Sequence, residues 1–301
     1  MLNMCFRDWE LTSGFSVHAV IRRHLPTRNW FAIFSILLCV IAPGGASADS
    51  MSENFSNLYQ GISDFGEKIF PGRKTMITIG LGPKYSPDYL GSDDYDFEPD
   101  VAFFVKLKRF EASNSGLSFD FLKQKNIALG TLVKFTGGRK EKANEVLTGL
   151  GNINKSIHLG LYAQYVLKTY SFRLAMLKDL TSWNQGWHGF FRISNLIYNN
   201  GPWAVIGAFR ATWGDDDYTS TWFGIDDEQS DNSGIPVYDV GSGIRDVSLE
   251  LSSRYALGAH WSIDASIRYR RLLSGAANSP LVADFGSADQ ITVAIYGAYT
   301  F

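Results

Sequence analysis

Three histidines follow residue 48, and they are the first candidates for chemistry in this sequence. His158, His188 and His260 lie on different segments, and their spacings do not match the paired ligands of a zinc site. His158 alternates with Leu159, so we expect it to face the interior, whereas His260 adjoins the turn at 257–259 and is expected at the surface. A serine–histidine pair would need a geometry that spacing does not give. We therefore expect no catalytic residue, no metal site and no cofactor.

Carboxylates form three short runs in which a hard cation is conceivable. The runs are Asp93-Asp94-Tyr95-Asp96, Asp215-Asp216-Asp217 and Asp226-Asp227-Glu228. Calcium needs convergent carboxylate and carbonyl oxygens, and the runs lack the spacing of an EF-hand loop. We interpret them as solvated loops. Both cysteines, Cys5 and Cys39, precede residue 48, which excludes disulfides and thiol chemistry from the rest of the chain.

The first 48 residues have the layout of a secretory signal peptide. A stretch with Arg22, Arg23 and Arg28 precedes an apolar run over 30–42, and the small triplet Ala46-Ser47-Ala48 follows. The run has 13 residues, too few to cross a bilayer as a helix. We expect cleavage after residue 48. Removing the four basic and two acidic residues of this leader changes the net charge from −2 to −4, which gives no reason to expect nucleic acid as a partner.

Alternation of apolar and polar residues dominates the chain after the leader. Every second residue is apolar in 261–270, and 247–257 alternates in the same way. A soluble β-sandwich also alternates, but these segments exceed the ~5–6 residues of typical strands and match the ~10 of membrane barrels. Aromatic residues such as Trp261 and Tyr269 lie near segment ends, as in interfacial girdles. We predict an all-β fold, a transmembrane antiparallel β-barrel of the outer membrane.

About twelve strands are expected, because bacterial barrels use even numbers. They are placed near residues 74–82, 98–108, 116–122, 126–136, 155–167, 170–179, 188–198, 202–213, 217–224, 244–257, 259–271 and 290–301. With both termini in the periplasm, 83–97, 225–243 and 272–289 become external loops. The long connection 137–154 then falls on the periplasmic side, where turns are usually short. Either a strand is miscounted or this connection has a function.

Charged residues alternate into the expected interior of the barrel. They are Arg210, Glu250, Arg254, Asp264, Arg268 and Arg270. Side chains of both signs either pair to fill a narrow barrel or line a water channel, and the sequence leaves both alternatives open.

The segment 49–73, between the leader and the barrel of 74–301, has a different pattern. Its apolar residues recur at roughly helical spacing, at Phe55, Leu58, Tyr59, Ile62, Phe65 and Ile69. Two interpretations stay open. The segment is either a short amphipathic helix, on the periplasmic leaflet or plugging the barrel, or a loosely ordered lead into the first strand.

The final strand ends in aromatic residues. Apolar residues stand at alternate positions from Ile291 to Tyr299 and Phe301. This arrangement resembles the C-terminal signal that the outer-membrane assembly machinery recognises. We interpret Tyr299 and Phe301 as an assembly signal, and we expect the assembly machinery and outer-membrane lipids as partners.

Several stretches of the barrel region are distinctive when taken together and in order. They are Gly82-Pro83 with 87–92 (PDYLGS), 147–153 (LTGLGNI), 222–225 (WFGI), 233–238 (SGIPVY), 271–273 (RLL) and 277–282 (ANSPLV). The series resembles the MipA/OmpV family of outer-membrane proteins, the MltA-interacting protein-like family, over residues 75–301. The resemblance implies an outer-membrane barrel without catalysis.

For one branch of this family, the resemblance implies a scaffold that links a murein-degrading lytic transglycosylase to a bifunctional murein synthase. Other members are porin-like or adhesive, so a narrow diffusion channel and a surface-exposed adhesin are the alternatives. We expect a non-enzymatic scaffold. Arg139, Lys140 and Lys142 are our candidates for docking the enzymes, because the connection 137–154 is long for the periplasmic side.

Overall fold

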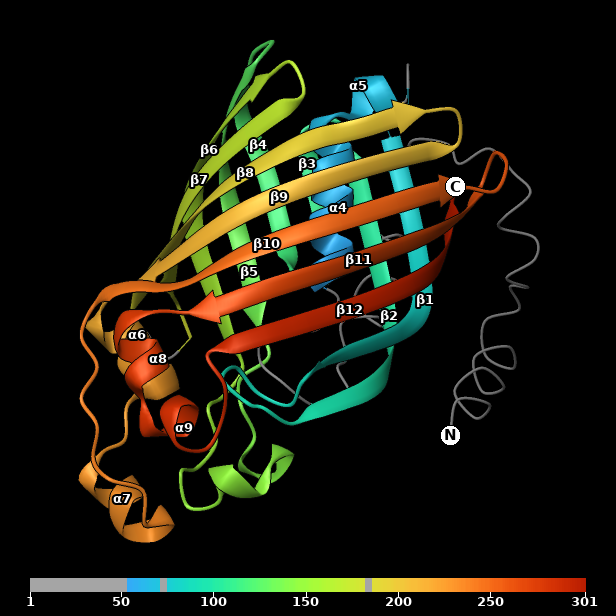
Figure 1. Ribbon diagram of the computed structural model, residues 1–301. Helices are drawn as coiled ribbons and strands as arrows, with labels where there is room; N and C mark the ends of the chain where they lie inside the picture. The colour runs from blue at the N-terminus through green and yellow to red at the C-terminus, as the bar shows by residue number, and fades with distance from the viewer. Residues whose placement is uncertain (1–52, 71–74, 182–185) are drawn as a thin grey trace, which may run out of the picture. The chain divides into compact units, whose positions relative to one another are not determined.

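The computed structural model describes residues 53–70, 75–181 and 186–301. The expected signal peptide, 1–48, lies outside the described residues. The described residues belong to one compact unit, 46–301, whose twelve strands close into an antiparallel barrel (Figure 1). The predicted fold class is therefore confirmed. Within the described ranges, no helix combines the length and the apolar character needed to cross a membrane.

Each strand pairs with its neighbours in sequence, and the last strand pairs with the first. The strands are β1 (Thr75–Pro87), β2 (Tyr95–Leu107), β3 (Phe110–Ser113), β4 (Gly116–Lys123), β5 (Ile127–Thr136), β6 (Ser156–Leu167), β7 (Tyr170–Asp179), β8 (Trp187–Asn200), β9 (Trp203–Gly214), β10 (Gly243–Ala256), β11 (Trp261–Leu272) and β12 (Asp289–Thr300). On β10, Glu250 is buried inside the barrel, whereas Leu249 and Leu251 are 59% and 48% exposed on the outside. Alternation thus gives a charged lumen and an apolar outer surface.

Aromatic side chains gather on the outer surface near the short turns. Trp203 packs edge-to-face on Tyr198 and Tyr255, with ring centroids 6.5 and 6.0 Å away. Trp261 packs on Tyr299 with centroids 5.0 Å apart. Large rings with one polar atom favour the membrane–water interface, so these residues form the girdle that the sequence predicted at strand ends.

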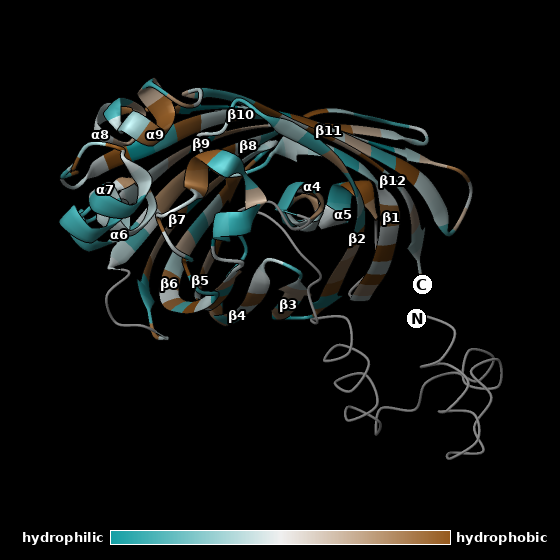
Figure 2. Cartoon of the chain, turned by 90° about the horizontal axis from the view of Figure 1, so that it is seen from below, coloured by the Kyte–Doolittle hydropathy of each residue, from teal (hydrophilic) through white to brown (hydrophobic). Residues whose placement is uncertain are grey.

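Helix α4 (Glu53–Asp64) lies inside the barrel, and the short helix α5 (Gly66–Ile69) follows it (Figures 1 and 2). The side chains of Phe55, Tyr59 and Ile62 are fully buried in one hydrophobic cluster with residues of β1, β2, β8, β9 and β12. The closest approach is at Gly80 of β1, where any Cβ would clash with the Phe55 ring. The described part of 49–73 is therefore a helix that fills the lumen.

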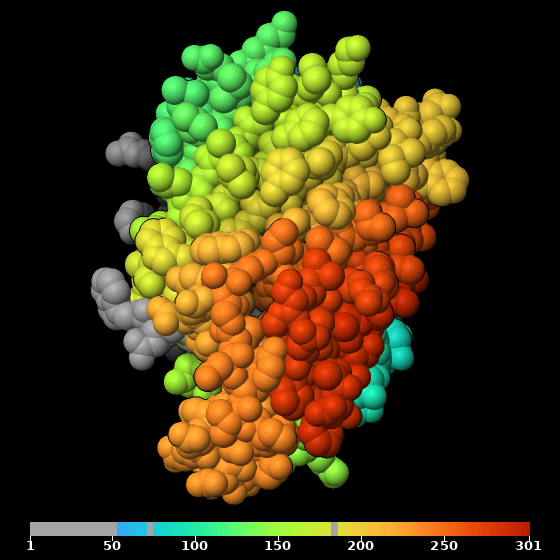
Figure 3. Space-filling view, turned by 60° about the vertical axis from the view of Figure 1, so that its left-hand side comes forward, coloured from blue at the N-terminus to red at the C-terminus, as the bar shows by residue number. Residues whose placement is uncertain are grey.

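Four long connections at one end of the barrel, 88–94, 137–155, 215–242 and 273–288, pack together, and we call them the cap. They contain η1 (Glu141–Ala143), η2 (Glu145–Leu147), α6 (Asp216–Phe223), α7 (Asp227–Ser233), α8 (Ser274–Asn278) and α9 (Pro280–Ala283). Their apolar side chains form two clusters, centred on Trp222 and on Leu147. Figure 3 shows these segments close-packed below the strands. Among residues 53–70, 75–181 and 186–301, the opposite end carries only short turns and α5.

Two of the strand predictions are wrong. Residues 217–224 form helix α6 instead, because the Asp215 side chain caps its N-terminus by accepting from the Tyr218 amide. The pattern also misses β3, whose four residues are too few to show an alternation. One missed strand and one false strand leave the total at twelve. Between residues 110 and 217, however, the predicted strands run in the wrong direction, so every connection there was assigned to the wrong end of the barrel. The connection 137–154 therefore lies at the cap end, together with the connections predicted to be external, and its predicted placement at the opposite end from them is wrong.

Candidate functional site

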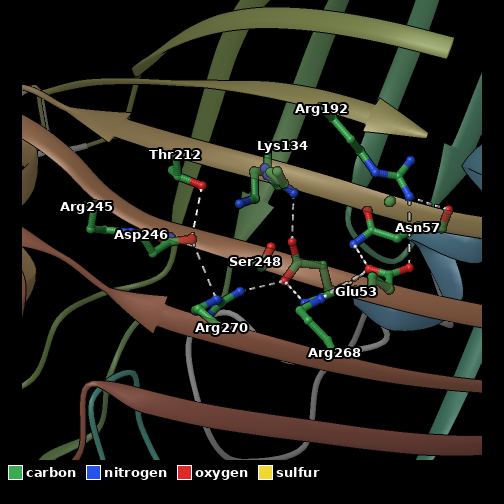
Figure 4. Close-up of a pocket in the computed structure, with 13 residues that line it drawn as sticks. Glu53, Asn57, Lys134, Arg192, Thr212, Arg245, Asp246, Ser248, Arg268 and Arg270 are labelled. Atoms are coloured by element: carbon green, nitrogen blue, oxygen red, sulfur yellow. Dashed lines mark hydrogen bonds and ion pairs between the residues drawn. The ribbon is translucent and has the colours of Figure 1, made fainter. Parts of the chain in front are cut away.

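Glu53, the first residue of α4, is the centre of a group of ion pairs inside the barrel (Figure 4). Its carboxylate lies 3.0 Å from Nη1 of Arg210, 2.8 Å from Nη1 of Arg268 and 3.4 Å from Nη2 of Arg270. These arginines come from β9 and β11, on either side of β10. A carboxylate in the first turn also interacts favourably with the helix dipole. Glu53 thus ties the inner end of α4 to the barrel wall.

Glu250 of β10 is the second carboxylate of this network. Its Oε2 accepts hydrogen bonds from Nη2 of Arg268 at 3.0 Å and from Nδ2 of Asn57 at 3.2 Å. Arg192 of β8 lies 3.9 Å from Glu250 Oε1 and donates to the Asn57 carbonyl at 3.2 Å. Both the backbone and a side chain of α4 are therefore held by the wall.

Tyr59 makes a third attachment of the helix. Its hydroxyl donates to Asp264 Oδ2 at 2.6 Å and accepts from Arg254 Nη1. Arg254 and Asp264 also form an ion pair at 3.4 Å, and both are buried. In a low-dielectric interior, a paired and hydrogen-bonded charge is stable, whereas an isolated one is not.

Basic side chains stand next to one another on three neighbouring strands, and we call this the arginine row. The register places Arg173 of β7 opposite Arg192 of β8, and Arg192 opposite Arg210 of β9. Like charges directly opposite each other destabilise a sheet. The carboxylates of Glu53 on α4 and Glu250 on the wall offset part of this repulsion, so α4 adds negative charge to that of the wall.

The sequence left open whether the charged residues of the lumen pair with one another or line a water channel, and the structure shows that they pair. The six predicted residues, Arg210, Glu250, Arg254, Asp264, Arg268 and Arg270, are buried or half-buried and form ion pairs inside the barrel. Two cavities of about 10 and 100 Å³ lie between α4 and the strands. Since one water occupies about 30 Å³ of liquid, the larger cavity has room for about three waters.

The structure brings together two histidines that the sequence separates. The rings of His158 and His188 have centroids 4.6 Å apart, and Ser156 Oγ lies 2.7 Å from His158 Nε2. Tyr218 of the cap stacks on His188 at 4.6 Å, and both histidines are at most 1% exposed. His158 thus faces inward and His260 is exposed, as predicted. Across residues 53–70, 75–181 and 186–301, no three His, Cys, Asp or Glu side chains are grouped as metal ligands.

The predicted docking residues divide into one buried and two exposed side chains, all in the cap. Arg139 is 4% exposed, and its Nη1 donates to the Trp222 carbonyl at 3.1 Å. Burial lowers the pKa of Arg139 to about 10. Lys140 and Lys142 are exposed. Docking through these residues stays a prediction, but they lie at the same end as the connections that were predicted to be external.

The acidic runs contribute structure to the cap. Asp226 and Gln229 form a capping box at the start of α7. Asn144 Nδ2 donates to Asp94 at 2.9 Å and to Asp88 at 3.1 Å. Burial, together with nearby carboxylates including Asp94, raises the pKa of Asp88. These side chains fix turns and helix starts in addition to meeting solvent.

The short-turn end carries a ring of exposed cations that the sequence analysis missed, and we call it the basic rim. Its members are Lys68, Lys108, Arg109, Lys123, Lys125 and Lys168. They come from α5 and from three successive short turns, β2–β3, β4–β5 and β6–β7. The sequence does show a lysine or arginine in each of these turns. This pattern indicates a shared basic surface only when the turns are known to lie at the same end of the barrel.

The predicted assembly residues lie near the same end, on the outer face. Phe301 is 53% exposed, and its ring centroid is 4.9 Å from that of Tyr299. Tyr299 also stacks on His260 at 5.4 Å. Their exposure leaves them accessible to another protein, and their role as an assembly signal stays a prediction.

Comparison with known proteins gives one family match. The family described as "MltA-interacting protein MipA" matches residues 79–301. Outer membrane protein OmpV of Vibrio cholerae is 27% identical over 231 residues, which are 73% of this chain and 85% of OmpV. Among solved structures, the COG4313 outer membrane channel from Pseudomonas putida F1 has a TM-score of 0.39 at 11% identity, covering 78% of this chain and 98% of that one. OprD from Pseudomonas aeruginosa has a TM-score of 0.35 at 15% identity, covering 67% and 59%.

Proposed function

Because the chain belongs to the MltA-interacting protein MipA family, we propose that it is a non-enzymatic scaffold that binds murein enzymes at the outer membrane. The barrel fold and the similarity to OmpV place the protein in the outer membrane. The proposed partners are a murein-degrading lytic transglycosylase and a murein synthase. The family match is the observation that carries this proposal.

The filled lumen supports a scaffold over an open channel. α4 is attached to the wall through Glu53, Asn57 and Tyr59, and the larger cavity beside it measures about 100 Å³. These attachments hold α4 in the space that a solute would need to cross the barrel. Breaking a buried ion pair on one side typically costs about 3–5 kcal/mol.

The basic rim is the proposed contact surface for the enzymes. Short turns of bacterial outer-membrane barrels face the periplasm, and murein enzymes act there. Lys108, Arg109 and Lys125 are exposed on neighbouring turns of this end. Complementary charge raises association rates and fixes the orientation of partners. The cap, with the exposed Lys140 and Lys142, then faces the cell exterior.

A comparison of two charge-reversal variants tests this assignment. One variant carries Lys108→Glu, Arg109→Glu and Lys125→Glu in the basic rim. The matched control carries Lys140→Glu, Lys142→Glu and Lys155→Glu in the cap, where Lys155 is also exposed. Tagged protein is purified from solubilised envelopes, its folding is checked by heat-modifiable gel mobility, and co-purifying proteins are quantified by mass spectrometry.

We expect a lytic transglycosylase to co-purify with the wild type and the cap variant, and to fall about tenfold or more with the rim variant, a change of ~1.4 kcal/mol in binding. Loss with the cap variant alone would instead support docking through Arg139, Lys140 and Lys142. Absence of murein enzymes from all samples would contradict the scaffold.

A narrow channel is the second candidate function, and the charged lumen favours it. Water-filled space beside α4 and the arginine row would give an anion-preferring path if the helix moved. Conductance steps of the purified wild-type protein in planar bilayers would support the channel. Their absence, with folded protein present, would leave the scaffold as the only candidate of the two.

A further inference from the structure

The larger luminal cavity has an unusual chemical lining. It lies between α4, the β3–β4 hairpin and the arginine row. Four cations line it (Lys134, Arg173, Arg192 and Arg210), against two carboxylates (Glu53 and Glu111). Both carboxylates already bind cations. Glu53 contacts three arginines, and Glu111 lies 3.0 Å from Lys106 Nζ. More basic than acidic side chains therefore line the cavity.

Arg173 carries a buried donor of this cavity that has no acceptor. Its side chain is 6% exposed, and its Nε has no hydrogen-bond partner among the described residues. Its guanidinium lies 4.0 Å from the centre of the Tyr162 ring, and Arg192 stands opposite it on the next strand. The Glu111 carboxylate, which pairs with Lys106, is also close enough to interact with Arg173 electrostatically. A buried donor without an acceptor is unfavourable, and a cation–π contact of about 0.5–2 kcal/mol does not supply one.

Two hydroxyl groups around the same cavity also lack partners. Ser56 Oγ of α4, on a residue that is 6% exposed, and Ser115 Oγ of the β3–β4 turn make no hydrogen bond in the described structure. Buried polar atoms are nearly always satisfied, by protein, water or ligand. These hydroxyls and the Arg173 guanidinium are all potential donors, so one acceptor could satisfy them together.

We propose that this cavity binds a phosphoryl-type oxyanion, with Arg173 as its principal ligand. The volume of about 100 Å³ suits a group of four or five heavy atoms, the space of about three waters. Arginine forks bind phosphate oxygens in a bidentate manner. Arg192 and the hydroxyls of Ser56 and Ser115 complete the site. The phosphoryl group belongs either to a free solute or to the headgroup of an anionic lipid. The site is independent of the proposed enzyme docking at the basic rim.

The test uses the protein purified in detergent, in HEPES buffer without phosphate or sulfate. Binding of inorganic phosphate is measured by equilibrium dialysis with radiolabelled phosphate, and thermal unfolding is followed with and without phosphate. The variants are Arg173→Gln and Arg173→Lys. The matched control is Lys178→Gln, which removes a cation from the outer face of the same strand, where Lys178 lies 5.8 Å from the Trp187 ring centre.

We expect the wild type and Lys178→Gln to bind one phosphate saturably and to unfold at higher temperature in its presence. Arg173→Gln should bind at least about tenfold more weakly, since it loses charged hydrogen bonds. Arg173→Lys should bind with intermediate affinity.

A second measurement identifies the source of the phosphoryl group. The protein is placed in nanodiscs of phosphatidylcholine with or without phosphatidic acid, and native mass spectrometry counts retained lipids. Retention of phosphatidic acid by the wild type but not by Arg173→Gln assigns a lipid headgroup, and phosphate binding alone assigns a free solute. The proposal is overturned if neither probe binds, or if both probes bind Arg173→Gln as well as they bind the wild type.

Discussion

The lumen and the cap are packed by different mixtures of interactions. In the lumen, Glu53, Glu250 and Asp264 pair with arginines of the wall around α4, and the apolar side of α4 packs in the cluster of Phe55 and Tyr59. In the cap, four connections meet through apolar clusters that include Leu147 and Trp222. Strand alternation places many polar residues in the lumen of a barrel whose outer face must be apolar, so charge pairing is added there to apolar packing. The cap has no such constraint, and it packs like a small soluble core.

The stretches that carry the family resemblance lie in the cap or enter it. Tyr89, Leu147, Ile225, Ile235 and Leu281 come from five of them and share one hydrophobic cluster. Their residue types therefore have a packing explanation, which holds whatever the cap contacts. Few of these stretches lie in the charged lumen, although the lumen determines whether solutes can pass through the barrel. The comparison predicts that lumen variants change permeability, whereas cap variants change only local loop stability.

The largest effect is expected for Glu53→Gln. This change leaves Arg210, Arg268 and Arg270 without their shared carboxylate, at a cost on the order of 3–5 kcal/mol. α4 should leave the wall, which would raise hydrogen exchange in 53–64 and produce conductance steps in planar bilayers. Glu67→Gln, an equal charge change on the exposed α5, is the control. Protection of α4 equal to that of the control would show that the ion pairs do not hold the helix.

A smaller and local effect is expected for Leu147→Ala in the cap. Leu147 is fully buried, and loss of a buried leucine costs about 2–5 kcal/mol. Hydrogen exchange should rise in 137–155 and 215–242, while α4 keeps its protection and the bilayer stays non-conducting. Leu257→Ala, at a residue 52% exposed in a short turn, should change neither. An increase in conductance for Leu147→Ala would mean that cap and plug form one cooperative unit.

The smallest effect is expected for Tyr59→Phe in the lumen. It removes the hydroxyl between Asp264 and Arg254 but leaves their ion pair at 3.4 Å. One buried hydrogen-bond partner is lost, which costs about 1–3 kcal/mol. The midpoint of denaturant unfolding should fall, and α4 should stay bound. The control is Tyr165→Phe on the outer face, where Tyr165 is 41% exposed, and it should leave the midpoint unchanged within error. Equal midpoints for the two variants would show that the Tyr59 hydroxyl does not stabilise the fold.

Most of the barrel could be predicted because each long strand carries its own alternation. β10 and β11 are defined by their own residues, so their boundaries lie within two residues of the prediction. β3 and α6 could not be predicted in this way. The first is set by pairing with β2 and β4, and the second by the aspartate cap at Asp215. Missing both reversed the side of 137–154, because side assignment depends on the parity of every strand before it.

The sequence by itself determined the barrel, the inward charges and the helical spacing of apolar residues within 49–73, since these follow from local periodicity. Only the tertiary structure decided that this segment lies in the lumen, that Glu53 meets Arg210 and Arg268, and that Arg173 stands beside Arg192. The reason is physical. Periodicity fixes which face of a strand a side chain occupies, whereas the register between strands fixes which charges meet, and closure of the barrel sets that register over long range.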